Sequence, residues 1–577
     1  MADRRVSGIR IGVLIAGVTA GSLLLTAVPQ GQQQTQGRGR AGQVQTPQVP
    51  TVGVPQIKVP TINVPDATQT GPAGPDSRQQ SETWVSPARM QGLVRASQLG
   101  LNYVPGEVLV KFKDGVGAPG QNRALSAMGS NQTADTVEWA AGLAVVRDAN
   151  QPNAYVLADQ MKAQAEVEFA EPNFIYRIDP FERAPVSAIP PQSGASTRNT
   201  RGRLASAPAG APTDADYAAY QWNFQLINMP SAWDLQPGGS ADVIVAVIDS
   251  GMTANSGTMT YPVWTGSSFQ TVSMPFAANP DLPATRHYLP KDYVGPKVPG
   301  SPLVDTDGHA THVSGTIGET TNNALLVSGV AYNVRIMPIK VCASYWDQMI
   351  YRAQIGLPGF ESDRSASCLN TDIADGIRYA VDNGARVINI SLGGPGTSTS
   401  IQSALTYASN RGAFVAISMG NDFEEGNETS YPAFYAGSLD GVMAVASVGY
   451  NSAKAWYSST GAHCEIAAPG GDSRTGTGRT DLGRVWQSTL IGNDLLGLVP
   501  RFDRYDKQPY QGTSMASPHV AGVAALLMSQ MPLLTGAQVE RILRMTATDL
   551  GAKGKDDVFG YGLIDPRKAL FGYGINR

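Results

Sequence analysis

The sequence predicts an α/β protein, a doubly wound parallel sheet with helices on both faces, preceded by a small α+β unit. Short runs of Val, Ile and Ala, such as residues 243–248, have no polar face, which is typical of strands buried in a parallel sheet. These runs alternate with segments of helical periodicity, as βα units do. The chain has 577 residues, more than one hydrophobic core usually fills, so we expect several domains.

The N-terminus reads as a secretory signal peptide over residues 1–30. Arg4, Arg5 and Arg10 form a basic start, and an apolar run follows over residues 11–25. We therefore expect a secreted protein with no stable membrane association after cleavage. An uncleaved membrane anchor is the alternative, because the apolar run is long for a signal peptide.

Residues 31–100 are predicted to be a disordered linker. They are rich in Gln, Pro, Gly and Thr and contain repeated Val-Pro pairs, a composition that cannot bury a core.

Residues 101–178 are predicted to form the small α+β unit. Alternating or apolar segments indicate strands at 105–112, 143–146 and 174–176, and helical spacing indicates helices at 122–128 and 157–165. Residues 179–213 are again polar and Pro-rich, with Arg198, Arg201 and Arg203. We expect this linker to be a site of proteolysis, because exposed tethers are cut readily.

Residues 214–577 carry the alternating pattern of the parallel sheet. The predicted strands are 243–248, 334–341, 387–391, 414–418 and 442–448, and the predicted helices begin at His309 or span 372–383, 401–409 and 535–548. Residues 252–306 and 342–371 are longer than tight connections, so we interpret them as surface insertions.

Ser514 is the candidate nucleophile. It follows Gly512 and Thr513 at the start of an apolar helical pattern, where backbone N–H groups and the helix dipole favour negative charge. The same three residues would also suit an ordinary helix N-cap, so the motif needs partners.

Two other segments supply such partners. Asp249 closes the strand predicted at 243–248, and His309 opens a helix in a segment that continues to His312. A hydroxyl nucleophile needs a base and a group that orients the base, and Ser, His and Asp supply these three roles. A zinc pair of His309 and His312 is the alternative, although no acidic or cysteine ligand stands at a recognised spacing.

Together, Asp249, His309 and Ser514 resemble the subtilisin-like serine proteases, whose catalytic residues follow that chain order. The similarity covers about residues 217 to 571. It implies a subtilisin-like fold and a serine endopeptidase that acts through an acyl-enzyme. One departure is Ala310, because this family usually has glycine after the catalytic histidine.

The resemblance also assigns further roles. It implies Asn421 as the oxyanion-hole donor and a substrate-binding segment made of Ser391, Leu392, Gly393 and Gly394. The pocket for the residue before the scissile bond would be completed by Ser418, Gly420 and Ser430, and large apolar residues would be favoured there. Asp422, Glu424 and Glu425 could draw basic residues as a second choice, or they could form a solvated acidic loop.

By the same resemblance, residues 101–178 are an inhibitory propeptide that the protease removes itself; an accessory binding module is the alternative. The expected partners are polypeptide substrates and this propeptide. With a net charge of −4 and no basic stripe, we expect no nucleic-acid partner, and we expect a monomer. A binding protein that keeps the fold without activity is the competing hypothesis.

Three cysteines allow one disulfide, and we expect it between Cys342 and Cys368, which flank an insertion. Cys464 is expected to be buried. The family also binds structural calcium, and the resemblance implies Asp281 and Asn323 as side-chain ligands, since oxygen atoms suit Ca²⁺. Turn-forming roles for the Asn residues are the alternative.

Overall fold

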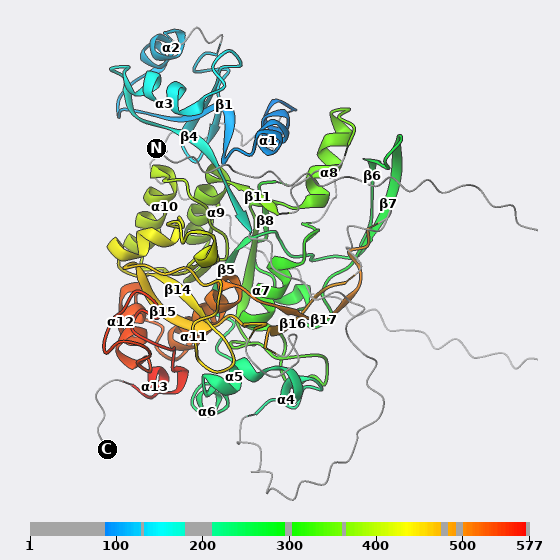
Figure 1. Cartoon of the computed structure of the whole chain (residues 1–577), viewed down its shortest axis with the longest axis vertical. Coiled ribbons are helices and arrows are strands. Elements are labelled where there is room, and N and C mark those ends of the chain that lie inside the picture. The colour runs from blue at the N-terminus through cyan, green and yellow to red at the C-terminus, as the bar shows by residue number, and fades with distance from the viewer. Residues whose placement is uncertain are drawn as a thin grey trace, which may run out of the picture. The chain divides into compact units, whose positions relative to one another are not determined.

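The structure is a computed structural model that describes residues 87–127, 132–178, 211–294, 303–359, 365–474, 483–491 and 500–572 (Figure 1). The predicted signal segment 1–30 lies outside the described residues. So do residues 31–86 of the predicted linker and residues 179–210 of the predicted processing segment. These parts of the domain prediction stay predictions.

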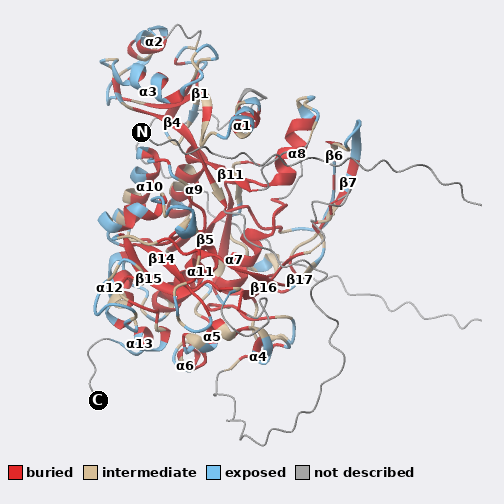
Figure 2. Ribbon diagram, viewed as in Figure 1, coloured by how far each residue is buried: buried red, intermediate tan, exposed pale blue. Residues whose placement is uncertain are grey.

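A seven-stranded sheet forms the centre of the larger domain, and its strand pairs are all parallel. The strands, in sheet order, are β15 (Cys464–Pro469), β14 (Val442–Val448), β13 (Phe414–Ser418), β12 (Val387–Ile390), β5 (Ile244–Asp249), β9 (Arg335–Lys340) and β8 (Lys291–Asp292). Every residue of β5, β12, β13 and β14 is buried, which explains their apolar sequences (Figure 2).

Helices cover both faces of this sheet, as predicted. On one face, α9 (Asn370–Asp382) and α10 (Thr399–Asn410) pack on each other and against β5, β9 and β13. On the other, α7 (His309–Gly318) packs on α11 (Thr513–Gln530), which also contacts β12 to β15. The shorter helices of this domain are α4 (Tyr217–Tyr220), α5 (Trp222–Leu226), α6 (Met229–Trp233), α12 (Gly536–Thr546), α13 (Pro566–Phe571) and the 3-10 helices η2 (Ala284–Arg286), η3 (Phe423–Glu425) and η4 (Ala433–Ser438).

The small N-terminal unit has a hydrophobic core of its own. Leu125, Leu157 and Met161 of its helices pack against Val108 and Val146 of its strands. Its last strand has 12 residues, so the strand predicted at 174–176 is only its end. The elements are β1 (Tyr103–Phe112), α2 (Ala118–Ser126), β2 (Glu138–Ala140), β3 (Leu143–Arg147), α3 (Ala154–Lys162) and β4 (Val167–Ile178).

The predicted linker 31–100 is wrong at its C-terminal end, where the chain forms helix α1 (Pro87–Leu99). Met90 of this helix is buried in a cluster with residues of the larger domain. Arg89 is also buried and donates hydrogen bonds of 2.8 Å to both Thr371 and Asp372. Because these contacts come from a distant part of the chain, the composition of the segment does not reveal the helix.

The end of β4 joins the two domains. On one side, residues 175–178 pair antiparallel with β11 (Ala366–Leu369). On the other side, the N–H of Arg177 donates to the carbonyl of Gly393 at 2.8 Å, and the reverse hydrogen bond is 3.0 Å long. Tyr176 is fully buried between them, and its hydroxyl donates to the carbonyl of Gly396. The C-terminal end of β4 therefore lies between two segments of the larger domain, β11 and the segment at Gly393.

Glu171, farther back on β4, holds the N-terminal end of α10. Its carboxylate accepts hydrogen bonds from the N–H groups of Thr399, at 2.6 Å, and Ser400, at 3.2 Å. The hydroxyl of Ser398 and the amide of Asn370 also donate to it, at 3.0 and 3.1 Å. A carboxylate suits this position, because the helix dipole favours negative charge at an N-terminus.

Both predicted insertions contain regular structure. Residues 252–306 include the hairpin β6 (Gly257–Trp264) and β7 (Phe269–Phe276), and residues 342–371 include β10 (Cys342–Ala343) and α8 (Tyr345–Gln354). β6, β7 and α8 pack with a second hairpin, β16 (Val485–Leu490) and β17 (Tyr505–Tyr510), around a separate hydrophobic cluster. The hydrophobic cluster is built from residues of both insertions and of this hairpin. Neither insertion therefore shows a complete hydrophobic pattern in its own sequence.

The disulfide prediction is confirmed, because Cys342 and Cys368 are bonded with an S–S distance of 2.05 Å. Cys464 is a free cysteine and is buried, also as predicted.

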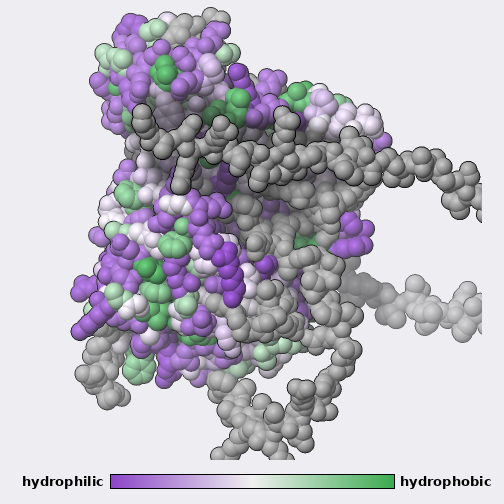
Figure 3. Space-filling model, in the orientation of Figure 1, coloured by the Kyte–Doolittle hydropathy of each residue, from purple (hydrophilic) through white to green (hydrophobic). Residues whose placement is uncertain are grey.

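The face shown in Figure 3 is mostly hydrophilic, and apolar residues are scattered over it. In the part of the chain that the structure describes, no helix combines the length and the apolar character needed to cross a bilayer.

Candidate active site

Asp249 and His309 form a buried pair. Asp249 ends β5 in the middle of the sheet, and His309 is the first residue of α7. The imidazole Nδ1 lies 2.9 Å from each carboxylate oxygen of Asp249. Both side chains have 0% exposure, so the imidazole is held in one orientation by a carboxylate that water does not screen.

Asp305, which the sequence reasoning missed, organises the turn before α7. Its carboxylate accepts hydrogen bonds from the N–H groups of Asp307 and Gly308, at 3.0 and 2.9 Å, and from the hydroxyl of Thr311, at 2.6 Å. The Ser250 hydroxyl, next to Asp249, also donates to it at 3.1 Å. An Asp side chain that accepts from the N–H two residues on forms an Asx turn, and the Asp-Thr-Asp-Gly run before His309 is the signal that could have identified it.

The electrostatic environment separates His309 from the other histidines. Burial by itself lowers the pKa of His309, but the adjacent Asp249 carboxylate raises it, and the net shift of its pKa is upward. Burial lowers the pKa of His312 to about 3 and the pKa of His519 to about 4. His309 is therefore the one of these three imidazoles that can exchange a proton near neutral pH.

The alternative of a zinc pair finds no support in the side-chain directions. Nε2 of His312 faces the carbonyl oxygens of Val485 and Gln508, at 3.2 and 3.1 Å, whereas His309 faces Asp249. Among the described residues, no group of three His, Cys, Asp or Glu side chains is arranged to hold a metal ion.

Ser514 is the second residue of α11, which packs on α7. The helix begins after Gly512, whose φ of 151° is one that side chains rarely permit. The Ser514 hydroxyl donates to the carbonyl of Ser391 at 3.3 Å, and the Ser391 hydroxyl donates to the carbonyl of Ser514 at 3.0 Å. These reciprocal bonds tie the start of α11 to the end of β12.

Asn421 is oriented by Thr513. The backbone N–H and the hydroxyl of Thr513 donate to Oδ1 of Asn421, at 2.9 and 3.0 Å. Because a backbone N–H can only donate, the atom that faces it must be the amide oxygen. The NH₂ group of Asn421 is thus the part of the side chain that can donate to a bound oxygen atom beside Ser514.

The structure brings together three residues predicted to shape the specificity pocket. A Cβ atom added to Gly393 would lie 2.4 Å from the Ser430 hydroxyl, and one added to Gly420 would lie 3.0 Å from the Ser430 Cβ. Side chains at either glycine would therefore fill the space around Ser430. Ser418 is the last residue of β13, two residues before Gly420, and Leu392 is buried.

The two predicted calcium ligands also lie together. The Asn323 amide donates to Oδ1 of Asp281 at 2.6 Å, and Oδ2 of Asp281 is buried with no hydrogen-bond partner among the described residues. Burial raises the pKa of Asp281 to about 6, and the nearby Asp214, which the sequence reasoning missed, adds to that shift. The buried Oδ2 of Asp281 is available to a divalent cation, whereas the Asp214 oxygens already accept hydrogen bonds from two backbone N–H groups and the Ser328 hydroxyl.

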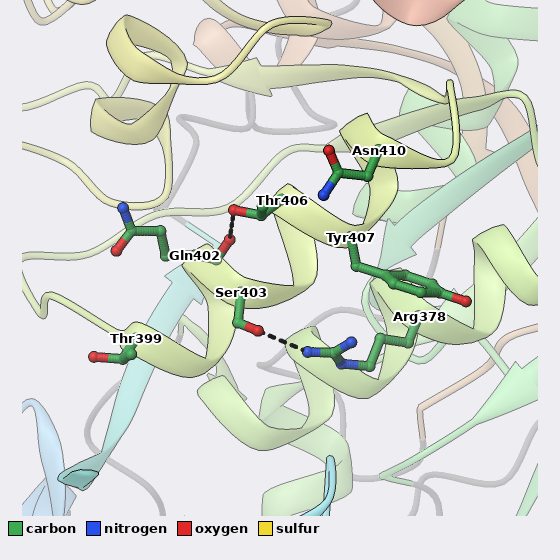
Figure 4. Close-up of a pocket in the computed structure, with 7 residues that line it drawn as sticks. All are labelled: Arg378, Thr399, Gln402, Ser403, Thr406, Tyr407 and Asn410. Atoms are coloured by element: carbon green, nitrogen blue, oxygen red, sulfur yellow. Dashed lines mark hydrogen bonds between the residues drawn. The ribbon is translucent and has the colours of Figure 1, made fainter. Parts of the chain in front are cut away.

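A pocket lies on α9 and α10 (Figure 4). Arg378 of α9 donates to the Ser403 hydroxyl at 3.0 Å, and the rest of the lining comes from α10. It contains none of the predicted site residues.

Two protein families match separate parts of this chain. Residues 240–562, more than half of the chain, match the subtilase family, and residues 92–173 match the fervidolysin N-terminal prodomain. The thermophilic serine proteinase of Bacillus sp. (strain AK1) is 29% identical over 81% of this chain and 88% of its own length. Subtilisin DY of Bacillus licheniformis is 36% identical over 46% of this chain and 78% of its own length.

The crystal structure of fervidolysin from Fervidobacterium pennivorans, described as a keratinolytic enzyme related to subtilisin, aligns with a TM-score of 0.56. The alignment covers 82% of this chain and 61% of fervidolysin at 22% identity, so it supports the fold alone. The family match spans the segments that carry Asp249, His309, Asn421 and Ser514. The chain therefore belongs to the subtilase family of serine endopeptidases.

Proposed function

We propose that Asp249, His309 and Ser514 form the catalytic triad of this endopeptidase. Ser514 attacks the carbonyl carbon of the scissile bond, and its proton passes to Nε2 of His309. The acyl-enzyme forms as His309 returns that proton to the leaving amine, and water then releases the acyl group. Asp249 holds the imidazole tautomer and stabilises the imidazolium.

The observation that carries this proposal is the contact of His309 Nδ1 with both oxygens of Asp249, at 2.9 Å each. With Nδ1 engaged, Nε2 is the nitrogen that accepts the proton. The Ser514 hydroxyl would then have to release the Ser391 carbonyl and donate to Nε2 instead.

The oxyanion would be stabilised by the Asn421 NH₂ group and the Ser514 N–H. Thr513 fixes the Asn421 amide before substrate arrives, so little reorganisation is needed when charge develops. Preorganised donors of this kind act mainly on the transition state.

We further propose that residues 101–178 are an inhibitory propeptide that the enzyme removes from its own precursor by cleavage within 179–213. The support is the end of β4, whose main chain pairs with β11 on one side and Gly393 on the other. An extended substrate would use the same backbone groups. Export through residues 1–30 and action as a monomer complete the proposal.

The competing hypothesis is a binding protein that keeps the fold without activity. Burying Asp249 and His309 at 0% exposure costs free energy, and a chain that only binds would gain nothing from keeping this pair. Hydrolysis of denatured casein by the mature chain separates the two hypotheses.

Ser514→Ala is expected to abolish casein hydrolysis and to leave the precursor joined across residues 179–213, because the nucleophile is lost. Asn421→Leu is expected to lower kcat by about 10²–10³ with little change in KM. Denaturing gels and steady-state kinetics on protease-free preparations measure both effects. Normal maturation of the Ser514 variant would contradict self-processing, and an unchanged kcat would remove Asn421 from the mechanism.

Proteolysis is expected to fall on acidification as His309 takes up a proton, with a midpoint above the ordinary imidazole pKa of about 6.5. The raised pKa also means that protonated His309 stabilises the folded chain below about pH 6.5, and that this contribution is lost as the pH rises through the folded-state pKa. The pH profile of kcat/KM tests the first statement. An activity optimum at about pH 4 would be incompatible with His309 as the base.

Cleavage is expected to be broad, after large apolar or aromatic residues, with a weaker and salt-sensitive tolerance of basic ones. Burying an apolar side chain in the space around Ser430 contributes about 1.5–3 kcal/mol. Glu424 is exposed and already paired with Arg474, so its attraction for a basic residue would be screened by salt. A peptide library varied at this position is read at low and high salt. A strict preference for Arg or Lys at high salt would contradict the assignment.

A structural calcium ion is proposed at Asp281 and Asn323, with Asp214 nearby. Bound calcium would neutralise the buried carboxylates and cross-link their loops. Calcium at a hundredfold excess over its Kd is expected to stabilise the fold by about 2.7 kcal/mol, seen as a higher thermal midpoint than in chelator. Asp281→Asn serves as the matched control and should abolish this calcium dependence. Equal midpoints of the unaltered protein with calcium and with chelator would refute the site.

A further inference from the structure

The disulfide lies at the edge where the propeptide tail binds. Cys342 and Cys368 face each other in the ladder between β10 and β11, which has just one other residue pair, Ala343 with Ser367. The opposite edge of β11 pairs with β4 over four residue pairs, and Tyr176 of β4 is the direct neighbour of Cys368. In the precursor, β11 is thus supported from both sides.

Removal of the propeptide would leave β11 with β10 as its strand partner. A two-stranded ladder is only marginally stable by itself, and a ladder of two residue pairs is shorter than most. The disulfide stands in this ladder, and both cysteines have 0% exposure. The covalent bond therefore has its largest structural effect after the propeptide has left.

The bridge also connects β11 to the catalytic centre. Cys342 follows Val341, whose N–H donates to the carbonyl of Asp249 at 2.9 Å. The path from the edge strand to the backbone of Asp249 thus consists of one disulfide, one peptide bond and one hydrogen bond. A second, non-covalent link is Gln348 of α8, whose amide donates to the carbonyls of Ala343 and Ser365, at 3.2 and 3.3 Å.

We propose that the Cys342–Cys368 bond is a positioning element for substrate. It keeps β11 in register with the triad in the mature enzyme, so that an extended peptide finds a preformed strand edge. This inference rests on the proposed function, because it assumes that substrates replace the end of β4. Its effect is confined to substrates long enough to pair with β11, since a short peptide reaches Ser514 without that edge.

The test measures cleavage of two chromogenic substrates by the mature enzyme. One has six residues on the amino side of the scissile bond (the hexapeptide), and the other has two (the dipeptide). In the double variant Cys342→Ala/Cys368→Ala, KM for the hexapeptide is expected to rise about tenfold, comparable to losing one backbone hydrogen bond. Its kcat and all constants for the dipeptide should stay the same. Cys464→Ala, which removes the free buried cysteine, is the matched control and should leave KM and kcat for both peptides the same.

An unchanged KM for the hexapeptide would overturn the inference, as would equal losses for both peptides, which indicate a role in stability alone. Gln348→Leu is the second variant if the double variant fails to mature. It should raise the hexapeptide KM by a smaller factor and spare the dipeptide, and no change would again overturn the proposal. If the unaltered enzyme cleaves neither peptide nor casein, the proposed function itself fails, and the inference falls with it.

Discussion

The site depends on one constraint of parallel sheets, namely that neighbouring strands end at the same edge. β13, β12 and β5 are consecutive in the sheet. The chain leaves β13 just before Asn421, leaves β12 at Ser391 and ends β5 at Asp249. Helix α11 then crosses these strands and brings Ser514 to the same edge. Four segments that are distant in sequence are thus assembled by the backbone pairing of the sheet.

The strands of this sheet and the residues at their ends could be predicted from sequence because each carries its own signal. β13 and β14 are buried on both faces, so their apolar runs are visible without any knowledge of their neighbours. Asp249, His309 and Ser514 stand at element boundaries with distinctive neighbours and a familiar chain order. A resemblance to a known family supplied the remaining assignments, including Asn421 and Ser430, whose roles local patterns do not indicate.

The elements that escaped prediction depend on partners far along the chain. Helix α1 is stabilised by the contacts of Arg89 with Thr371 and Asp372, so its own composition resembles a linker. The hairpins and α8 share a core that no single insertion contains. Asp305 and Asp214 act through hydrogen bonds to neighbouring loops, and an isolated Asp in a turn looks the same whether or not it does so.

The position of β4 also has a consequence in time. A chain that becomes available from its N-terminus presents β4 long before β11 and Gly393, the two segments that enclose the end of this strand. Ser514 comes later still. β4 is therefore made before β11 and Gly393, and these segments before Ser514. At every stage of its formation, the edge made by β11 and Gly393 closes on a strand that is already present.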